Sequence, residues 1–348
     1  MRSRCPAMKV ATTFAVSLVT IVLLFSCKKS TEPVIPGWEV LSIGTNADLF
    51  AVDFVDENYG WMIGRDTVVF HTTDGGNTWV RQSYPNYQLL GLPLRDIQCI
   101  DQQLGWAVGG GYNGFICKTT DGGNNWFIQD TVKGRSVNCI FFTDPSHGWV
   151  CGGSSAGFLR TADGGDTWDS ISSPYVIYLR DFVDSLNGWA FGQGGSILHT
   201  ADGGLTWVNM FPEHVDSCLL DFVDLYHGWG LIVSRVSEYE QWFWVIHTTD
   251  GGHSWEPQLS IFNNQDGNSA IGPLMMLNQN TGWIGKWESR KASVLHTTDG
   301  GKSWLDQPLP FIGDKSIADM EFINEKVGWA VGTGGLLLRT KNGGNPIR

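Results

Sequence analysis

A short segment of the form Thr-x-Asp-Gly-Gly-x-Thr-Trp recurs along the chain. It first occurs at Thr72–Trp79, returns at intervals of 39 to 49 residues, and ends as an incomplete copy at Thr340–Gly344. A chain that repeats one unit of this length builds an architecture in which each copy packs against the next. The aspartates of the six complete copies are Asp74, Asp121, Asp163, Asp202, Asp250 and Asp299, and Asn342 takes their place in the seventh.

A Gly-Trp pair alternates with this segment and also occurs seven times. Four residues before each of these glycines lies an Asp or Asn, and six residues before it lies a large or soft apolar residue. Two motifs that are both seven-fold and in phase predict seven units of four short strands. The glycines of the pairs are Gly60, Gly105, Gly148, Gly188, Gly228, Gly282 and Gly328.

The fold predicted by these units is all-β, a seven-bladed β-propeller with four-stranded blades. The seventh copy lacks its Trp and its fourth strand, whereas the segment that begins at Gly37-Trp38 has the character of a fourth strand without a blade. We therefore expect the N-terminal strand, at about residues 38–43, to complete the last blade and close the ring. Closure would remove an open sheet edge that otherwise promotes aggregation.

The Asp of each repeated segment is predicted to be structural. Its carboxylate can accept hydrogen bonds from nearby amides and hydroxyls, and the paired glycines can adopt positive φ angles. A residue that recurs in six blades does not mark one catalytic centre, so we expect no catalytic residue, metal or cofactor. Four histidines precede these turns on separate blades: His71, His199, His247 and His296. By the same reasoning we expect them to be packing residues.

The repeated turns resemble the Asp-box, also called the bacterial neuraminidase repeat (BNR). Combined with the Gly-Trp pairs and the apolar–x–Asp step, they are similar to the photosystem II assembly and stability factor-like propellers over about residues 38–348. The resemblance implies the propeller fold and a role in binding proteins, since members in photosynthetic cells chaperone a reaction-centre subunit. Those members are described as using an arginine patch, whereas this chain has 12 Arg and a strongly acidic balance.

The N-terminus has the pattern of a lipoprotein signal peptide. Arg2, Arg4 and Lys9 precede an apolar stretch that ends in Leu24-Phe25-Ser26-Cys27. Such a stretch is too short for a spanning helix, and its ending resembles a lipobox, in which the Cys is lipidated. We expect residues 1–27 to be the signal peptide, 28–36 a linker and 37–348 the propeller. The alternative is an ordinary signal peptide that contains a Cys.

This interpretation predicts an exported monomer that is lipid-anchored through Cys27 in a bacterial envelope, in the outer membrane if the host is Gram-negative. The net charge is −12, and loss of residues 1–27 would remove three positive charges and no acid, which gives about −15. That balance argues against nucleic acid as a partner and against electrostatic docking on anionic lipid, so the membrane is reached through the lipid anchor only. Five cysteines remain, an odd number, and their strand-like positions favour small core residues: Cys99, Cys117, Cys139, Cys151 and Cys218.

Strand order predicts two unlike faces. The repeated turns share one face, while the links between blades and the hairpins between second and third strands share the other. That second face collects the irregular segments, including Pro308-Leu309-Pro310-Phe311, and most aromatic residues outside the repeats. Tyr and Trp on variable loops are typical of recognition surfaces, although they could also pack the loops. The candidate binding residues are Tyr84, Tyr87, Tyr112, Tyr175, Tyr239, Trp242, Trp244 and Trp287.

Two functions are compatible with this pattern. The first is a non-enzymatic scaffold that binds an unidentified envelope protein. The second is a carbohydrate-binding or sialidase-like glycoside hydrolase propeller, for which Arg95 and Arg180 would be candidate arginines. Acids on the innermost strands could also line the ring axis and hold a cation or water: Asp53, Asp96, Asp181, Asp221, Asp319 and Glu321.

Overall fold

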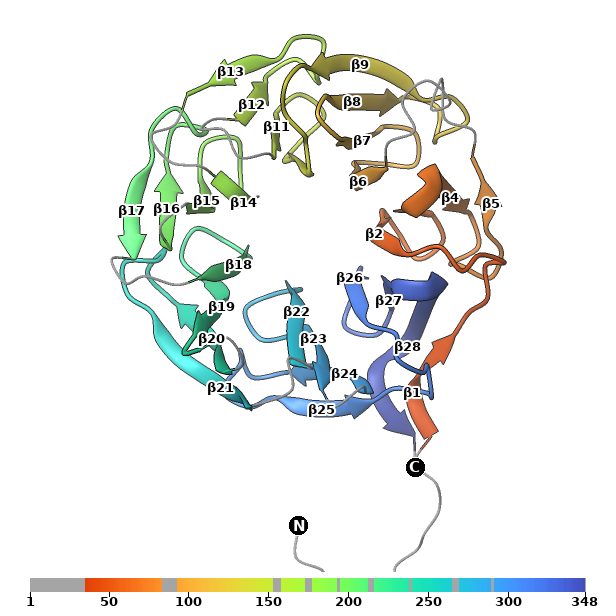
Figure 1. The fold of residues 1–348 in the computed structure, drawn as a ribbon, viewed down its shortest axis with the longest axis vertical. Helices are drawn as coiled ribbons and strands as arrows, with labels where there is room; N and C mark the ends of the chain where they lie inside the picture. Colours follow the sequence, from red (N-terminus) through yellow and green to blue (C-terminus); the bar gives the residue numbers. More distant parts are fainter. Residues whose placement is uncertain are drawn as a thin grey trace, which may run out of the picture. The chain divides into compact units, whose positions relative to one another are not determined.

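The structure of the protein is a computed structural model, in which residues 35–82, 93–152, 158–172, 177–192, 195–211, 216–237, 240–264, 269–288 and 291–347 are described. These residues form seven four-stranded antiparallel sheets arranged as the blades of a ring (Figure 1). The predicted seven-bladed all-β propeller is therefore confirmed. The predicted signal peptide, Cys27 and most of the predicted linker lie outside the described residues.

Each blade runs from an innermost strand outward, in sequence order. Blade 1 consists of β2 (Leu49–Phe54), β3 (Gly60–Gly64), β4 (Val68–Thr72) and β5 (Val80–Arg81). Blade 2 consists of β6 (Leu94–Cys99), β7 (Gly105–Gly110), β8 (Gly114–Thr119) and β9 (Phe127–Val132). Blade 3 consists of β10 (Cys139–Phe142), β11 (Gly148–Cys151), β12 (Phe158–Thr161) and β13 (Asp169–Ile171).

The next three blades follow the same order. Blade 4 consists of β14 (Ile177–Phe182), β15 (Gly188–Gly192), β16 (Ser196–Thr200) and β17 (Val208–Phe211). Blade 5 consists of β18 (Ser217–Phe222), β19 (Gly228–Arg235), β20 (Glu240–Thr248) and β21 (Glu256–Asn264). Blade 6 consists of β22 (Ser269–Met276), β23 (Gly282–Glu288), β24 (Lys291–Thr297) and β25 (Leu305–Pro308).

Blade 7 joins the two ends of the chain. It consists of β26 (Ile317–Phe322), β27 (Gly328–Gly332), β28 (Leu336–Ile347) and β1 (Ile35–Val40). The expected closing strand is present, but it starts at Ile35 and not near residue 38. It starts earlier because β28 continues through the last turn motif, so that Gly37 lies opposite Gly344 and Ile35 opposite Ile347.

The core lies between neighbouring blades. Each Trp of a Gly-Trp pair is buried and donates its indole N–H to a glycine carbonyl in the turn of the next blade. Trp329, for example, stacks on Phe54 with ring centroids 3.4 Å apart and donates to the Gly75 carbonyl at 3.2 Å. Stacking of this kind adds to the free energy of burial and fixes the contact between blades.

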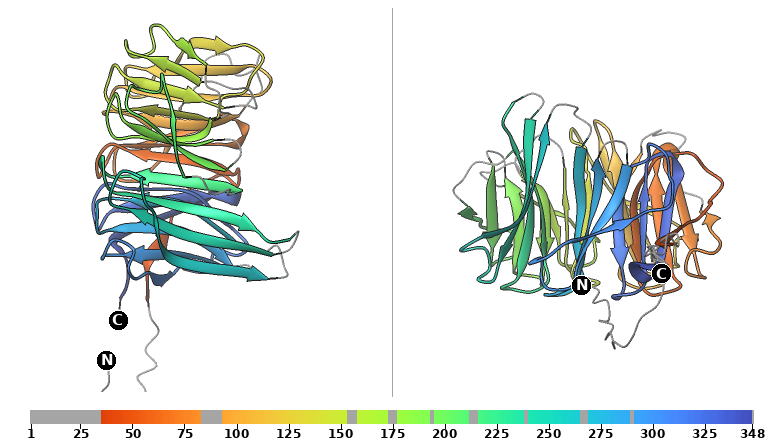
Figure 2. Two further views of the ribbon diagram at one scale, coloured as in Figure 1. Left: turned by 90° about the vertical axis from the view of Figure 1, so that its left-hand side faces the viewer. Right: turned by 90° about the horizontal axis from the view of Figure 1, so that it is seen from below.

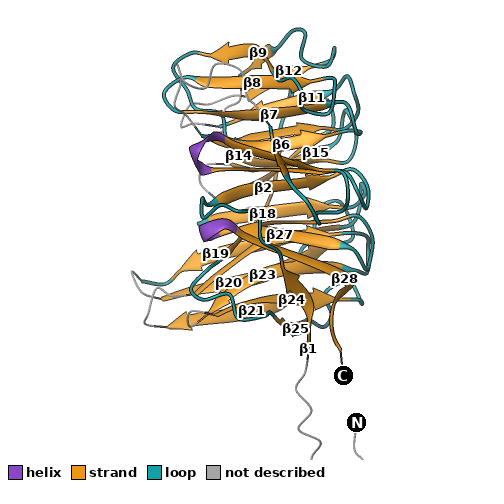
Figure 3. Cartoon of the chain, turned by 90° about the vertical axis from the view of Figure 1, so that its right-hand side faces the viewer, coloured by secondary structure: helices purple, strands orange, loops and turns teal. Residues whose placement is uncertain are grey.

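Two 3-10 turns complete the described elements, at Arg65–Thr67 and Thr333–Gly335. Figure 3 shows both turns on the same side of the ring as the long β19–β20 hairpin, which Figure 2 shows projecting beyond the other blades. Among the described residues, no helix has the length and apolar character needed to span a bilayer.

Candidate functional site on the loop face

The two faces of the ring differ as the strand order predicts. The Gly-Trp turns and the Asp-box turns meet on one face, where the Gly75 amide donates to the Asn58 carbonyl at 2.9 Å and equivalent bonds recur in the other blades. We call this side the Asp-box face. The opposite side carries the hairpins between second and third strands and the links between blades, and we call it the loop face.

The Asp-box carboxylates are occupied within their own turns. Asp163 accepts hydrogen bonds from the Thr161 hydroxyl at 2.8 Å, the Thr167 amide at 2.9 Å and the Thr167 hydroxyl at 2.6 Å. These bonds, first of all that from the Thr167 hydroxyl, lower the pKa of Asp163 to about 2. The pKa of the corresponding carboxyl is also lowered in Asp74, Asp121, Asp202, Asp250 and Asp299.

The four aligned histidines pack against tryptophans of their own blades. Ring centroids are 4.6 Å apart for His71 and Trp61, and 4.9 Å apart for His296 and Trp283. His199 and His247 contact Trp189 and Trp229 in the same way. Burial lowers the pKa of all four, so they are neutral near pH 7.

Four of the candidate binding residues, Tyr84, Tyr87, Tyr175 and Tyr239, lie outside the described residues. Among the rest, Tyr112 is 82% exposed at the β7–β8 hairpin on the loop face. Trp287 lies on β23 and is half-buried, and its indole N–H has no hydrogen-bond partner among the described residues.

Trp242 and Trp244 form an aromatic cluster on the outer part of blade 5. Their ring centroids are 5.4 Å apart, and Trp242 lies 4.6 Å from the ring of Phe262 on the neighbouring strand. Phe262 is 40% exposed, whereas Trp242 and Trp244 are half-buried. Trp244 also packs against the core between blades 4 and 5, so it is in part a packing residue.

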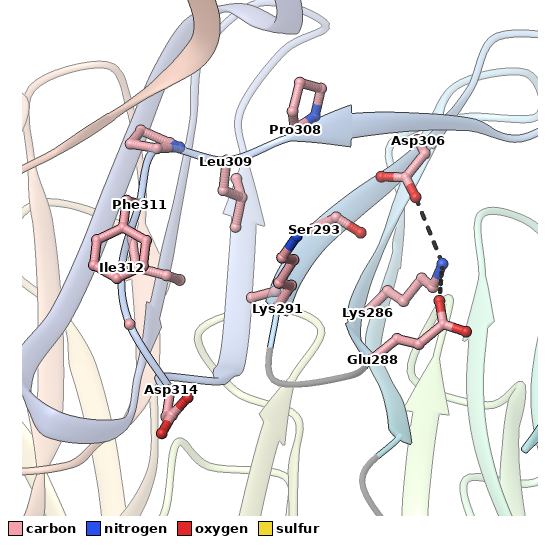
Figure 4. A pocket seen from close by; sticks show the side chains of 13 residues that line it. Lys286, Glu288, Lys291, Ser293, Asp306, Pro308, Leu309, Phe311, Ile312 and Asp314 are labelled. Atoms are coloured by element: carbon pink, nitrogen blue, oxygen red, sulfur yellow. Dashed lines mark ion pairs between the residues drawn. The ribbon is translucent and has the colours of Figure 1, made fainter.

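A cavity of about 750 Å³ lies on the loop face between blades 6 and 7. One wall is apolar and comes from the link after β25, with Pro308, Leu309, Phe311 and Ile312 (Figure 4). Leu309 and Ile312 pack on the core of blade 7, whereas Phe311 is 98% exposed. The link therefore presents an aromatic ring to solvent at the edge of the cavity.

The other wall is charged. The Lys286 ammonium lies 2.7 Å from Glu288 and 3.5 Å from Asp306, and Figure 4 shows these ion pairs opposite the apolar link. Burial alone would lower the pKa of Lys286, but its hydrogen bond to Glu288 and the negative charges of Glu288 and Asp306 raise it. Lys291 lines the same cavity, is exposed and has no ion-pair partner among the described residues. Its ammonium group is therefore available to an acidic ligand.

The sequence pattern places the Pro308–Phe311 link and the segment Lys286-Trp287-Glu288 on the loop face, but it does not predict the ion pairs of the charged wall. The long β23–β24 hairpin was a usable signal, because its residues alternate across the sheet and place Lys286 and Glu288 on one side. The position of Asp306 beside them depends on the pairing of β24 with β25.

Arg95, one of the two arginines considered for a sialidase-like site, does not line the cavity between blades 6 and 7. The Arg95 guanidinium lies 5.5 Å from the ring centre of Phe50 and lines a second loop-face cavity of about 620 Å³. The described lining of that cavity contains no carboxylate. Arg180 is on β14, and its side chain is outside the described part of the chain.

The acids of the innermost strands link neighbouring blades around the axis. Asp53 accepts a hydrogen bond from the Cys99 amide at 2.7 Å, and Asp319 accepts one from the Val52 amide at 2.9 Å. Asp96 accepts likewise from Ile140, Asp181 from Phe222 and Asp221 from Met276. The described residues include no group of three or more His, Cys, Asp or Glu side chains placed to hold a metal ion.

Burial raises the pKa of these inner carboxyls. It reaches about 7 for Asp53, Asp221 and Asp319, and it is also raised for Asp181 and Glu321. Repulsion between the acids adds to the effect, for example between Asp53 and Asp96. Asp53, Asp221 and Asp319 therefore titrate near neutral pH, although each accepts a hydrogen bond from a backbone amide.

The family profile described as photosynthesis system II assembly factor YCF48 matches residues 31–130 and 130–214, just over half of the chain. The photosystem II assembly lipoprotein Ycf48 of Synechococcus sp. (strain CC9902) is 26% identical over 188 residues, which cover 49% of this chain and 51% of the relative. The protein of the same name from Synechocystis sp. is 29% identical over 82 residues, 23% of this chain and 24% of the relative. The matched region thus spans about half, or less, of the length of these curated relatives.

Solved structures share the fold. A structure of YCF48 bound to D1 peptide aligns with a TM-score of 0.66 at 19% identity and covers 88% of this chain and 99% of that one. YCF48 from Cyanidioschyzon merolae aligns with a TM-score of 0.65 at 18% identity and covers 87% and 98%. At such identities the likeness establishes the propeller fold, while the profile match over half of the sequence establishes the family. The chain belongs to the family of photosystem II assembly factor YCF48-like BNR propellers.

Proposed function

We propose that this protein is a non-enzymatic scaffold, tethered to a membrane by lipid, that binds a polypeptide segment of an envelope protein on its loop face. The observation that carries the proposal is the cavity between blades 6 and 7. It combines an apolar wall, a fully exposed aromatic side chain and a charged wall within about 750 Å³. Concave sites with a few placed polar groups are typical of ligand recognition.

The chemistry of the cavity fits a polypeptide. Phe311 and the neighbouring link can take an apolar side chain, and Lys291 can pair with a carboxylate of the same segment. The charge of Lys286 is already matched by Glu288 and Asp306, so it holds the wall in place. A related fold, that of YCF48, has been solved with D1 peptide bound, which supports a peptide as the kind of ligand.

The tether rests on two observations. The sequence ends its apolar leader with Leu24-Phe25-Ser26-Cys27, and curated relatives are named lipoproteins. We propose that Cys27 carries the lipid and that the protein is exported to the cell envelope, with the outer membrane as its place in a Gram-negative host. We also propose that it acts as a monomer, because the closing strand satisfies the last sheet edge within the chain.

A non-enzymatic role is supported by the hydrogen bonds that the acidic side chains accept. The inner carboxylates accept backbone hydrogen bonds between blades, and the Asp-box carboxylates accept bonds within their turns. Glycan binding is a second candidate, favoured by the half-buried Trp242 and Trp244 beside the exposed Phe262. Stacked aromatic rings at a surface offer the apolar faces that sugar rings contact.

A pull-down with matched variants tests the proposal. The chain from Lys28 is immobilised and incubated with detergent-solubilised envelope from the native host. We expect one membrane protein to be retained by the wild type and lost by Phe311→Ser. Leu305→Ser is the control, because Leu305 is 67% exposed in the same blade but does not line the cavity.

Equal retention by Phe311→Ser and Leu305→Ser would remove the cavity from the proposal. Retention of glycan without protein, lost by Trp242→Ala together with Trp244→Ala, would replace it with the carbohydrate-binding function. Phe311→Ser and Leu305→Ser alter exposed side chains, so their thermal unfolding should match that of the wild type.

A further inference from the structure

The turns of the Asp-box face expose four large apolar side chains among the described residues, all of them in blades 4 and 5. Leu186 is 50% exposed, Leu205 55%, Leu225 41% and Tyr226 61%. Among the described residues, these are the large apolar side chains that the turns of this face expose. We call these four residues the apolar patch.

The fold does not require apolar residues at these positions. The place of Leu186 and Tyr226 in the Gly-Trp turns is taken in the other blades by Asn58, Gln103, Ser146, Asn280 and Lys326. The place of Leu205 in the Asp-box is taken by polar residues throughout, including Asn77 and Asn124. Since five blades form the same turns with polar side chains, folding of these turns does not require the apolar ones in blades 4 and 5.

The hydrogen bonds of the turns hold the patch together. The Gly203 amide donates to the Leu186 carbonyl at 2.8 Å, which places Leu186 beside the turn that contains Leu205. The Gly251 amide donates to the Tyr226 carbonyl at 3.0 Å. Trp189 of blade 4 donates to the Gly251 carbonyl at 2.9 Å and so joins the turns of the two blades.

The surroundings of the patch are acidic. The turns of blades 3 to 5 on this face contain seven aspartates and no Lys or Arg: Asp144, Asp163, Asp166, Asp184, Asp202, Asp224 and Asp250. Hydrogen bonds from the turns lower the pKa of Asp163 and of Asp250 to about 2, so these carboxylates are ionised at neutral pH. Two cations from neighbouring strands reach these turns: the Lys118 ammonium lies 2.8 Å from the Gly164 carbonyl and 3.9 Å from Asp166, and Arg160 donates to the Asp202 carbonyl at 3.4 Å. The other lysines in turns of this face are in blades 6 and 7, at Lys302, Lys326 and Lys341.

We propose that the apolar patch and its acidic surroundings form a second docking surface, which binds a cationic amphipathic polypeptide segment. Leucine and tyrosine side chains would take the apolar residues of the segment, and the ionised aspartates would face its Lys and Arg side chains. This surface lies opposite the loop-face cavity, so the inference goes beyond the proposed function and does not depend on it. A scaffold with both surfaces could hold two partners at once.

Charge favours a polypeptide over a lipid surface as the occupant. Anionic lipid repels a face with seven ionised or ionisable carboxyls around its apolar residues.

The experiment is a fluorescence anisotropy titration of a labelled 14-residue peptide with leucines on one helical face and lysines on the other. The protein is the chain from Lys28, which contains all seven blades and the closing strand. The variant combines Leu186→Ser, Leu205→Asn and Tyr226→Asn. Each introduced residue type already occupies the equivalent turn position in another blade. We expect at least about a tenfold loss of affinity, since the variant removes the apolar contacts.

Matched controls separate this surface from the first one. Phe311→Ser and Leu305→Ser should bind the peptide as the wild type does, and a peptide with Glu in place of each Lys should not bind. Equal affinity of the wild type and the triple variant would overturn the proposal. So would sedimentation of the wild type, but not of the variant, with phosphatidylcholine vesicles, since the patch would then be a lipid-binding surface. If the triple variant unfolds at a lower temperature, the single variant Leu205→Asn gives the same comparison.

Discussion

The carboxylate of each Asp-box aspartate acts within its own turn. Asp299 accepts hydrogen bonds from the Thr297 hydroxyl at 2.9 Å, the Ser303 amide at 2.9 Å and the Ser303 hydroxyl at 2.6 Å. The glycines that follow the aspartate adopt φ angles near +74° and +87°, which other residues resist. In the seventh copy Asn342 accepts from the Thr340 hydroxyl at 3.0 Å, so a neutral side chain can serve the same turn.

This comparison predicts the effect of substitutions at Asp299. Asp299→Asn should lower the melting temperature less than Asp299→Ala, because Asn keeps an acceptor oxygen whereas Ala leaves the donors of Thr297 and Ser303 without one. Thermal unfolding followed by circular dichroism measures the difference. Lys302→Ala in the same turn is the control and should leave the melting temperature nearly unchanged, because Lys302 is exposed. Equal effects of Asn and Ala would show that the charge of the carboxylate matters more than its bonds.

The strand β1 closes the ring, because it pairs with β28 and so joins the two ends of the chain. Trp38 is 3% exposed, lies edge-on to Phe322 with ring centroids 5.6 Å apart, and donates to the Gln307 side chain at 3.2 Å. The same edge-on contact is made by Trp79 with Phe54 in blade 1. One side chain from the N-terminal strand thus supplies the residue that the seventh repeat lacks.

Removing the Trp38 side chain should weaken the closure of the ring. Trp38→Ala is expected to lower the free energy of unfolding by about 3–5 kcal/mol, the usual cost of removing a buried aromatic ring. Val40→Ala in the same strand should cost far less, since Val40 is 49% exposed. Urea unfolding measures both, and gel filtration reports whether an opened blade 7 associates through the edge of β28. Similar costs for the two variants would mean that β1 contributes little to closure.

The repeated elements could be predicted from the sequence, whereas the irregular ones could not. Gly-Trp and Asp-box motifs fix the turns, and the turns fix the strands between them, which is why the seven blades and the role of Trp38 follow from spacing alone. The start of β1 at Ile35 was missed because β28 does not turn after Gly344 as its equivalents do. The loop-face cavity depends on how the link through Phe311 folds back on blade 7, and no repeat specifies that conformation.

The complete ring brings six acids together around its axis, from strands far apart in sequence. The innermost strands supply Asp53, Asp96, Asp181, Asp221, Asp319 and Glu321 (Figure 1). Burial raises the pKa of Asp53, Asp221 and Asp319 from 3.8 to about 7. In the unfolded chain the same groups titrate near 3.8, so folding and protonation of these carboxyls are linked.

The sign of this linkage predicts how stability depends on pH. A carboxyl with a raised pKa in the folded state stabilises the fold fully below pH 3.8, and this contribution is lost as the pH rises towards 7. The Asp-box carboxyls act in the opposite sense, because their pKa is lowered to about 2 in Asp163 and Asp250, and their contribution is lost as the pH falls through 2. The four buried histidines oppose the inner acids, because their lowered pKa makes the fold more stable as the pH rises through about 6.5. We expect the inner acids, three of which reach a pKa of about 7, to outweigh them, so that the free energy of unfolding is higher at pH 5 than at pH 8 and falls again below about pH 3.

Urea unfolding at pH 3, 5, 6.5 and 8 tests this expectation. A variant of an inner-strand acid shows whether that acid causes the pH dependence of the free energy of unfolding. Asp53→Asn keeps an acceptor for the Cys99 amide but cannot ionise, so the decrease between pH 5 and pH 8 should be smaller than in the wild type. Asp66→Asn is a control on the loop face, outside the inner strands, and should leave the pH profile unchanged. A wild-type profile that is flat or rises from pH 5 to pH 8, with the same slope in Asp53→Asn, would mean that the inner acids are ionised in the folded ring, with cations or water balancing their charge. In that case the axis would have to be treated as a hydrated, charged passage and not as a set of protonated contacts between blades.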